Sequence, residues 1–301
     1  MALHIAVKTC VILNPSAGSA ADTDSLREKL ARLSPNEIKI TAEPGEAQRF
    51  ARDAASLGCD LIISAGGDGT LNEVVNGVAE KNSSVRLAIL PLGTGNDFAR
   101  SIGLPTNLDE CIELIAQGRT KAIDLVRVTS DQVRYFVNVS TGGFSGLVDE
   151  KLTPEIKKTW GPLAYLRGAA AALPELRAYK TKIVFDGTDE IEIALHNVII
   201  GNGRYVAGGI PVTPEALVND GLVDVVLIPE KPKTELAVLV AQILLGKHLS
   251  SEAIVYRRTA KVAVTSKPGM WFNVDGELVG NEPASFEVLP GAIQFIVGAT
   301  T

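Results

Sequence analysis

Four apolar runs in the N-terminal part of the chain, separated by helical patterns, constrain the fold more than any other feature. Between the runs, apolar residues recur at helical spacing, as at Leu26, Leu30 and Leu33. Strands that are apolar along their whole length are buried on both faces, which is typical of a parallel sheet covered by helices. The runs are VKTCVILNP (7–15), IKITA (38–42), CDLIISAGG (59–67) and VRLAILPLG (85–93).

Each of these runs ends in glycine or polar residues. In open α/β sheets, ligands bind beyond the carboxyl ends of the strands. We therefore expect the four clusters to lie along one edge of the sheet and to form a ligand site there. The clusters are Asn14 to Gly18, Thr41, Gly66 to Thr70 and Gly93 to Asp97.

From about residue 121 onward, short alternating strands are joined by Asp-Gly, Asn-Gly and Pro-Gly turns. This pattern is typical of an antiparallel β domain, interrupted here by helices expected near 160–173 and 232–246. We expect an α/β domain over residues 1–127 and a β-rich domain over 128–290. The last apolar run, AIQFIV (292–297), either returns to the first domain, so that residues 291–301 complete it, or stays with the second.

Composition excludes several classes of protein. The net charge of -6 and the pI of about 5.3 argue against a nucleic-acid partner. The three cysteines are widely spaced without a CxxC pair, which favours reduced thiols over a zinc site or disulfides. The start of the chain lacks a signal-peptide pattern. The longest apolar stretch, 236–246, is about half of what a membrane span needs. We expect a cytoplasmic protein that is not transmembrane. Two further possibilities are peripheral contact with the inner face of the membrane and assembly into a homodimer.

The third apolar run leads into Gly66-Gly67-Asp68-Gly69-Thr70, and a helical pattern, TLNEVVNGV (70–78), begins at once. Backbone N–H groups of glycine can approach phosphate oxygens closely, and the N-terminus of a helix favours anions. The alternative is a tight strand-to-helix turn without a ligand. Because such a motif is rare by chance, phosphate binding is the favoured interpretation.

This segment resembles the GGDGT nucleotide loop of diacylglycerol kinases, sphingosine kinases, NAD kinases and phosphofructokinases. PLGTGNDFARSIGLP (91–105) resembles a signature of the diacylglycerol kinase catalytic domain. Segments 201–228 and NVDGELVG (273–280) resemble motifs of the soluble bacterial lipid kinases of the YegS type. The resemblance covers nearly the whole chain. It implies a Rossmann-like α/β domain, as in phosphofructokinases and NAD kinases, followed by an antiparallel β sandwich.

The resemblance also implies an ATP site. In the NPSAG turn, Asn14 and Ser16 either contact the phosphates of the ATP or form only an ordinary Asn-Pro turn. Asp97 orients Mg²⁺-bound phosphates, caps the helix that begins at DFARSI, or does both. Many family members carry a lysine or arginine soon after the NPSAG turn, and GSAAD (18–22) has none. The residues that the resemblance assigns to ATP are Thr41, Gly66, Gly67, Asp68, Gly69, Thr70, Leu71, Asn72 and Thr94.

Phosphoryl transfer to an alcohol needs a carboxylate that accepts the hydroxyl proton and Mg²⁺ that spreads the phosphate charge. The resemblance places the proton acceptor in Asp275-Gly276-Glu277. By analogy we assign Glu277 as the base and Asp275 as a ligand of metal or hydroxyl, with an exchange of the two roles left open. The same residues also predict a hairpin with a type I′ turn at Asp-Gly.

A Mg²⁺ site at Asp220 is implied by the resemblance as well, with further ligands at Leu217 and Leu222. Leucine side chains cannot bind a metal, so these two residues contribute backbone carbonyl groups if they contribute at all. Asp124 is a candidate for the same acidic network. The site is either structural or catalytic.

Together these features predict an ATP- and Mg²⁺-dependent lipid kinase whose substrate, diacylglycerol or a related glycerolipid, is presented at a membrane surface. Two alternatives are an NAD kinase-like phosphotransferase, which shares GGDGT and an Asn72-Glu73 pair, and a non-catalytic protein that senses nucleotide or lipid. The stretch 157–176 is either a core helix or an interfacial helix. The acceptor lipid is not encoded in any motif.

Overall fold

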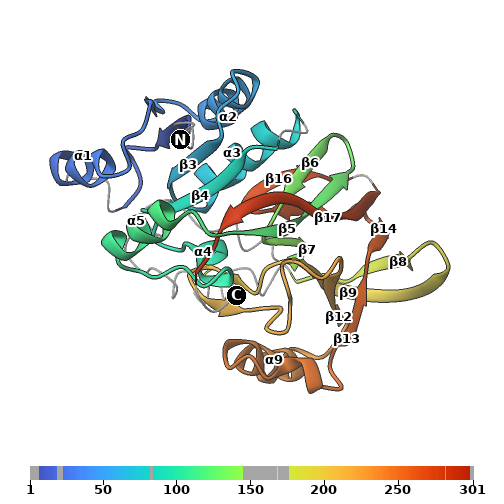
Figure 1. Ribbon diagram of the computed structural model, residues 1–301. Coiled ribbons are helices and arrows are strands. Elements are labelled where there is room, and N and C mark those ends of the chain that lie inside the picture. Colours follow the sequence, from blue (N-terminus) through green and yellow to red (C-terminus); the bar gives the residue numbers. More distant parts are fainter. Residues whose placement is uncertain are drawn as a thin grey trace. The chain divides into compact units, whose positions relative to one another are not determined.

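The computed structural model describes residues 7–18, 23–81, 84–144, 168, 176–281 and 283–298 (Figure 1). The chain forms two compact units. The first unit comprises residues 1–123 and 291–301, and the second comprises residues 124–290. The chain passes between the units within two strands, β5 (Thr120–Thr129) and β17 (Ala284–Ile296).

A parallel sheet forms the centre of the first unit. Its strand order is β17-β4-β3-β1-β2, and every neighbouring pair is parallel. Ile63 of β3 pairs with Val11 on one side and with Ala88 on the other, so the apolar runs lie side by side. The strands besides β17 are β1 (Thr9–Leu13), β2 (Glu37–Ile40), β3 (Leu61–Gly66) and β4 (Arg86–Pro91).

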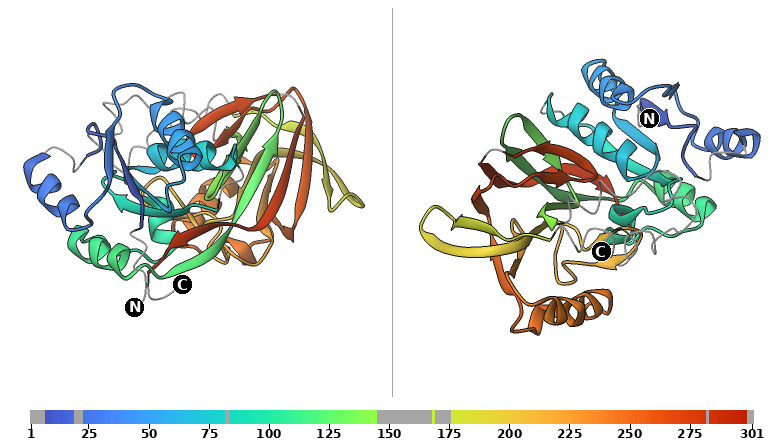
Figure 2. Two further views of the ribbon diagram at one scale, coloured as in Figure 1. Left: turned by 45° about the horizontal axis from the view of Figure 1, so that its top comes forward. Right: turned by 180° about the vertical axis from the view of Figure 1, so that it is seen from behind.

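Helices cover both faces of this sheet (Figure 2). On one face, Leu30 of α1 and Ile112 of α5 pack against buried strand residues. On the other face α2 and α3 approach closely, because a Cβ on Gly77 of α3 would lie only 2.2 Å from the carbonyl oxygen of Gln48. The sheet is therefore buried on both sides, as the apolar runs require. The helices are α1 (Thr23–Ala31), α2 (Glu46–Ser56), α3 (Asp68–Ala79), α4 (Asp97–Ser101) and α5 (Leu108–Gln117).

The second unit is built from antiparallel strands. The first half of β9 (Asp189–Gly201) pairs with β8 (Tyr179–Phe185), and its second half pairs with β7 (Val139–Gly143) and β12 (Val223–Pro229). From β8 the order continues through β14 to β17, and from β7 it continues through β15 to β16. The other elements are β6 (Val133–Phe136), β10 (Tyr205–Val206), β11 (Ile210–Pro211), β13 (Val255–Thr259), β14 (Lys261–Lys267), β15 (Phe272–Val274), β16 (Glu277–Gly280), α9 (Lys233–Leu244) and the 3₁₀ helix η2 (His248–Ser250).

The second half of β9 is buried on both faces of the sheet, although residues of a strand alternate between the two faces. Val198 of β9 belongs to a cluster with Phe272 and Phe286, whose rings pack edge to face with 5.2 Å between their centroids. The next residue, Ile199, faces the other way and packs in a second cluster with Leu239 of α9. Residues of other strands therefore pack on one face of β9, and α9 packs on the other face.

The fold class predicted from the sequence is confirmed, since a parallel α/β unit is combined with an antiparallel β-rich unit. The helix expected over 232–246 is α9. The helix expected over 160–173 falls outside the described residues, apart from residue 168. The sequence did not predict β13, which carries two arginines and, among the described strands, pairs with β12 alone. Among the described residues, no helix is both long and apolar enough to cross a bilayer.

The three cysteines are free, with Cys10 and Cys111 buried and Cys59 half-buried. Burial raises the pKa of Cys10 to about 12 and that of Cys111 to about 11. Both side chains therefore remain protonated thiols at neutral pH and act as small core residues.

Candidate functional site

The loop between β3 and α3 presents backbone rather than side chains. At Gly66 an added Cβ would lie 2.4 Å from Oγ1 of Thr70, so only glycine fits there. Gly67 is the N-cap residue of α3, with φ -97° and ψ -169°, and as a glycine it offers no side chain of its own to cap the helix. The first N–H groups of a helix have no partner within the helix and carry the positive end of its dipole. A helix end of this kind favours an anion.

Gly69 differs from the two glycines before it. Its φ lies outside the left-handed region, and nothing lies within 4 Å of the position that a Cβ would take. Neither backbone strain nor packing therefore requires glycine here. The close approach of a ligand to the backbone would explain a glycine at position 69, whereas the fold alone does not explain it.

Asn96 holds a second loop, which connects β4 to α4. Its backbone is left-handed, with φ 51°. Its side chain accepts the N–H of Gly93 at 3.0 Å and donates to the carbonyl of Gly93 at 2.7 Å. A Cβ on Gly93 would lie 2.5 Å from the Cα of Gly67, so the two glycine loops touch. Asn96 occupies the N-cap position, and Asp97 is the first helical residue rather than the cap.

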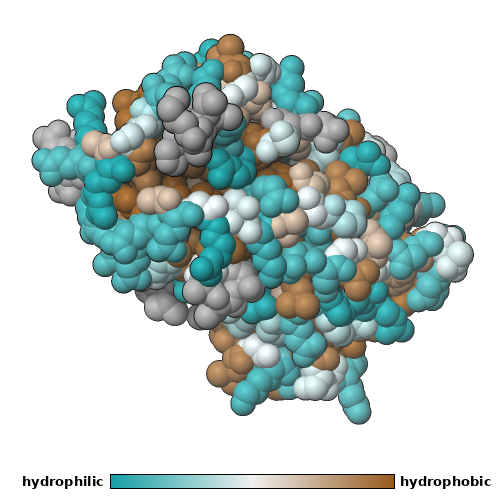
Figure 3. Space-filling view, viewed as in Figure 1, coloured by the Kyte–Doolittle hydropathy of each residue, from teal (hydrophilic) through white to brown (hydrophobic). Residues whose placement is uncertain are grey.

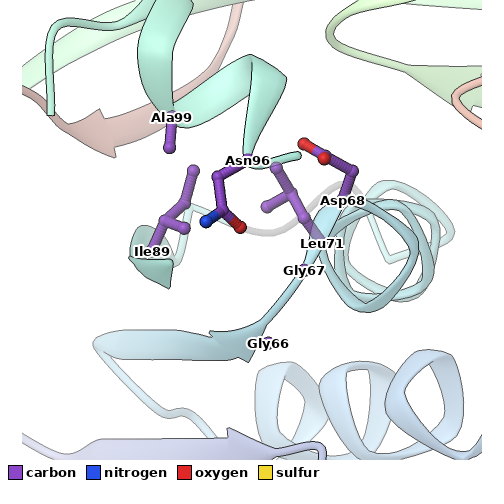
Figure 4. A pocket seen from close by; sticks show the side chains of 7 residues that line it. All are labelled: Gly66, Gly67, Asp68, Leu71, Ile89, Asn96 and Ala99. Carbon is purple, nitrogen blue, oxygen red and sulfur yellow. The ribbon is translucent and has the colours of Figure 1, made fainter. Parts of the chain in front are cut away.

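Between these loops lies a small hollow of about 160 Å³ (Figure 4). The one carboxylate in its lining belongs to Asp68, whose Oδ1 accepts the N–H of Phe98 at 3.3 Å. Burial raises the pKa of Asp68, and backbone N–H groups at the start of α4 oppose this to a smaller extent. The hollow is lined by Gly66, Gly67, Asp68, Leu71, Ile89, Asn96 and Ala99.

The NPSAG turn lies against the first turn of α3. Nδ2 of Asn14 donates to Oγ1 of Thr70 at 3.1 Å. Oδ1 of Asn14 accepts the N–H of the exposed Ser16 at 2.9 Å. The amide of Asn14 therefore shapes its own turn and joins it to the GGDGT segment.

Thr41 and Thr94 lie beside this turn in different ways. Thr41 is buried, and its N–H donates to the carbonyl of Leu13 at 2.9 Å, which places it at the carboxyl end of β1. Thr94 is exposed, and a Cβ on Gly18 would lie 3.4 Å from its Oγ1. The structure thus brings together the polar clusters that follow β1, β2, β3 and β4.

The Asn72-Glu73 pair has structural partners. The carboxylate of Glu73 accepts the N–H of Gly45 at 2.9 Å and the N–H of Ala47 at 3.0 Å, and so it caps α2. Asn72 is buried, and its Oδ1 accepts a bond from the side chain of Asn76 at 2.6 Å. Both carboxylate oxygens of Glu73 and Oδ1 of Asn72 thus have partners within the chain.

The acidic residues of the second unit lie on the hairpin of β15 and β16. Asp275 and Gly276 form its turn with φ 46° and 97°, as a type I′ turn requires. The carboxylate of Asp275 accepts the N–H groups of Val139 at 2.8 Å and Val137 at 3.2 Å, and this ties the hairpin to the start of β7. Glu277 is half-buried, and among the described residues its carboxylate has no hydrogen bond or ion pair.

The turn predicted to bind Mg²⁺ is held by two carboxylates and one guanidinium group. Oδ1 of Asp220 accepts the N–H of Leu222 at 3.1 Å, and Oδ2 of Asp124 accepts the N–H of Gly221 at 2.7 Å. Oδ2 of Asp220 forms an ion pair with Arg258. No group of three or more His, Cys, Asp or Glu side chains within the described ranges could hold a metal. The oxygens suit a hard cation, which would compete with Arg258 for Asp220.

A buried carboxylate, Asp224, completes this network. It is fully buried, its Oδ1 accepts the hydroxyl of Tyr256, and its Oδ2 lies 3.6 Å from Nε of Arg258. Burial raises the pKa of Asp224, and the Tyr256 and Arg258 contacts oppose this shift. Arg258 therefore serves two carboxylates at once.

Two family models cover most of the chain. The model described as "Diacylglycerol kinase catalytic domain" matches residues 8–128. The model described as "YegS C-terminal NAD kinase beta sandwich-like domain" matches residues 138–297 and alone spans more than half of the sequence. The chain belongs to the family of diacylglycerol kinases and YegS-type lipid kinases. The resemblance drawn from the four sequence motifs is thereby confirmed.

Relatives of this lipid kinase are similar over nearly their whole length. A protein of Pectobacterium atrosepticum described as "Probable lipid kinase YegS-like" is 34% identical over 302 residues, which cover 95% of this chain and 94% of the relative. A "Diacylglycerol kinase" of Staphylococcus saprophyticus is 31% identical over 283 residues, with 92% and 90% covered. The crystal structure of a diacylglycerol kinase from Bacillus anthracis str. Sterne matches with a TM-score of 0.73 and 25% identity over 97% of each chain. The protein is therefore an enzyme, a phosphotransferase with an alcohol group as acceptor.

Three side chains that shape this lipid kinase's candidate sites were not assigned there from the sequence. Asn96 had a usable signal, because asparagine after a glycine loop tolerates the left-handed region. Glu73 was noted only as part of a pair, and its role as the cap of α2 depends on a contact between two helices. Arg258 lies 38 residues from Asp220 along the chain, and no spacing rule links the two.

Proposed function

We propose that this enzyme transfers the γ-phosphate of ATP to the free hydroxyl of diacylglycerol or a related glycerolipid, in a reaction that needs Mg²⁺. The observation that carries the proposal is the N-terminus of α3, where the N-cap residue is the glycine Gly67 and the open position Gly69 follows in the first turn. At that position the chain offers backbone N–H groups and leaves space over the backbone. A phosphate chain is the ligand class that suits both properties.

The nucleotide is assigned to the clusters that follow the parallel strands. Backbone N–H groups of the GGDGT loop contact the phosphates. Thr94 and the NPSAG turn lie close enough to this loop to contribute side chains. Asp97 is buried at the start of α4, where its carboxylate orients the phosphates through their cation. The proposed ATP-binding residues are Asn14, Ser16, Thr41, Gly66, Gly67, Asp68, Gly69, Thr70, Leu71, Asn72, Thr94 and Asp97.

Glu277 is proposed as the general base, which accepts the proton of the lipid hydroxyl as its oxygen attacks the γ-phosphate. Support comes from the contrast between the two acids of the hairpin. The carboxylate of Asp275 is engaged by backbone N–H groups of residues 137 to 139. We therefore assign Asp275 the task of positioning the hairpin and leave Glu277 to meet the hydroxyl.

Mg²⁺ is assigned to the Asp220 carboxylate and the backbone carbonyl groups of Leu217 and Leu222. When bound, such a cation would neutralise part of the negative charge that Asp124, Asp220 and Asp224 bring to this turn. For Asp220 to bind it, the ion pair with Arg258 must loosen. The buried Asp224 then retains Arg258 as its partner. The protein thus keeps a positive charge at this turn with or without the metal.

A transfer assay tests the proposal. The protein is incubated with γ-labelled ATP and Mg²⁺ in separate mixed micelles of diacylglycerol, phosphatidylglycerol or a sphingoid base, and in solution with NAD. We expect label in the diacylglycerol or phosphatidylglycerol product, and none in NAD. The same assay on a total lipid extract of the host, followed by identification of the labelled product, then identifies the acceptor lipid without a prior choice of candidates. Glu277→Gln should bind ATP normally and transfer label roughly 10²–10⁴-fold more slowly. Label in NAD alone would contradict the proposal, and ATP binding without transfer to any lipid would favour a non-catalytic sensor.

A further inference from the structure

Helix α9 is apolar on the side that faces solvent. From Leu236 to Gly246 the sequence LAVLVAQILLG contains no charged residue. Leu236 and Leu239 are buried against the sheet of the second unit. The opposite side, here named the α9 outer face, is exposed. It consists of Ala237, Val238, Val240, Ala241, Leu244 and Leu245.

The exposure of this face is large. Val238 is 60% exposed and Leu245 is 69% exposed. At the lower end of Figure 3, where α9 lies in Figure 1, brown apolar residues reach the surface among white and teal ones. A helix that is apolar all round is normally buried all round. Exposed contiguous apolar surface in turn marks sites of contact with proteins or membranes. The α9 outer face therefore has the properties of a binding surface.

Lysines flank this face at both ends. Lys233 starts the helix and Lys247 follows it, and both are exposed. Among the described residues, neither side chain has an ion pair. The acid nearest to the apolar stretch, Glu235, is paired with Lys231 at 3.4 Å. The surface thus has an apolar centre with net positive ends, although the whole chain carries a net charge of -6.

We propose that the α9 outer face binds a bilayer surface containing anionic phospholipids, with its aliphatic side chains among the acyl chains and Lys233 and Lys247 at the phosphate groups. At 12 residues, α9 is about 18 Å long, which suits a helix lying in the plane of the interface and is too short for a span. The proposal extends the proposed function, because a kinase whose substrate is a membrane lipid must meet that substrate at a bilayer.

A second copy of the chain fits this face less well. In a two-fold symmetric dimer each patch meets itself. Two α9 helices packed antiparallel would place Lys233 near the partner's Lys247, and a parallel pair would place each lysine near its own counterpart. Like charges meet in both cases, without an unpaired acid on the face to compensate. An anionic membrane supplies the opposite charge at both ends of the helix.

Vesicle co-sedimentation tests this inference without ATP or turnover, so a failure of the proposed lipid kinase activity leaves the result readable. Wild-type protein is titrated with vesicles of phosphatidylcholine alone and with phosphatidylglycerol added. We expect binding to the anionic vesicles. The double variant Leu244→Gln, Leu245→Gln should weaken that binding roughly tenfold or more, given the apolar area of two leucines. Lys233→Gln with Lys247→Gln should reduce the preference for anionic vesicles by roughly fivefold per lysine.

Leu57→Gln is the matched control, because Leu57 is 67% exposed in the first unit and belongs to no such face. Its vesicle binding should equal that of the wild type. Circular dichroism melting of each variant checks that the fold is kept. Wild-type protein that does not bind anionic vesicles, or equal binding by the leucine variant, overturns the inference. Sedimentation equilibrium adds one more outcome, since a dimer that the leucine variant converts to monomer without a change in vesicle binding would assign the face to a second copy.

Discussion

Gly69→Ala separates the needs of the fold from those of the nucleotide. Nothing lies within 4 Å of the added Cβ, and the backbone of Gly69 is compatible with alanine. The new methyl group would stand over the first turn of α3, where the phosphates are proposed to contact backbone N–H groups. We therefore expect a protein that folds at least as well as the wild type and binds ATP much more weakly.

The two effects have different sizes. Replacing glycine by alanine at a compatible position stabilises a protein by roughly 0.4–1 kcal/mol, because the unfolded chain loses freedom. For a chain of this length, that corresponds to a rise in melting temperature of about 0.6–1.6 °C. A methyl group that keeps a phosphate oxygen from one N–H removes a charge-assisted hydrogen bond of about 1.5–3 kcal/mol. The dissociation constant for ATP should then rise roughly 10- to 100-fold.

Isothermal titration with ATP and thermal melting measure the two effects on the same samples. Gly77→Ala is the control, because its Cβ would lie 2.2 Å from the carbonyl oxygen of Gln48 on α2. It should lower the melting temperature and leave the affinity of the folded protein for ATP near that of the wild type. ATP binding by Gly69→Ala as tight as that of the wild type would refute the placement of phosphates over residue 69.

Three further changes test the remaining assignments. Glu277→Gln should lower kcat by roughly 10²–10⁴-fold and leave the melting temperature unchanged. Asp275→Asn should cost about 1–3 kcal/mol of stability, because an amide group would then face backbone N–H groups. The opposite result for the two variants would exchange the roles of the two residues. Arg258→Gln should tighten Mg²⁺ binding roughly two- to fivefold, because an exposed ion pair is worth little; weaker binding in a calorimetric titration contradicts the competition. Burial raises the pKa of Asp68 above 3.8, so the folded state holds the carboxyl proton more tightly than the unfolded state does. The stability of the wild type therefore falls as pH rises from 3.8 to the raised pKa of the folded state. Asp68→Asn should therefore gain stability relative to the wild type across it in urea unfolding, and a pH-independent difference would contradict this.

The elements of the fold could be predicted wherever local pattern decides structure. The apolar runs became β1, β3 and β4, and the Asp275-Gly276 pair forms the turn that its residue types favour. β2 was expected to be buried like the others, yet it lies at the edge of the sheet and is mostly exposed. The charged residues Glu37 and Lys39 indicate one open face of β2, but the exposure of Ile38 and Ile40 on the other face depends on strand order rather than on local composition.

The candidate site could be predicted where glycine residues indicate the conformation of a loop. The Gly66 and Gly93 loops were expected at the carboxyl edge of the sheet, and they pack against each other there. Partners of charged groups could not be foreseen. The Glu73 carboxylate meets the start of α2, and Arg258 meets Asp220, through contacts between segments far apart in the chain. Only the folded structure brings such groups within reach.

The parallel pairing of β17 with β4 has a consequence for the order in which the protein can assemble during synthesis. The first unit takes its outer strand from residues beyond 290, so the whole of the second unit must leave the ribosome before that strand exists. Until then β4 has an open edge, and Phe98 of α4 lacks the ring of Phe295, which in the finished protein lies 5.3 Å away edge-on. The packing of Phe98 and the outer edge of β4 are therefore completed last, only when translation of the β-rich half is over.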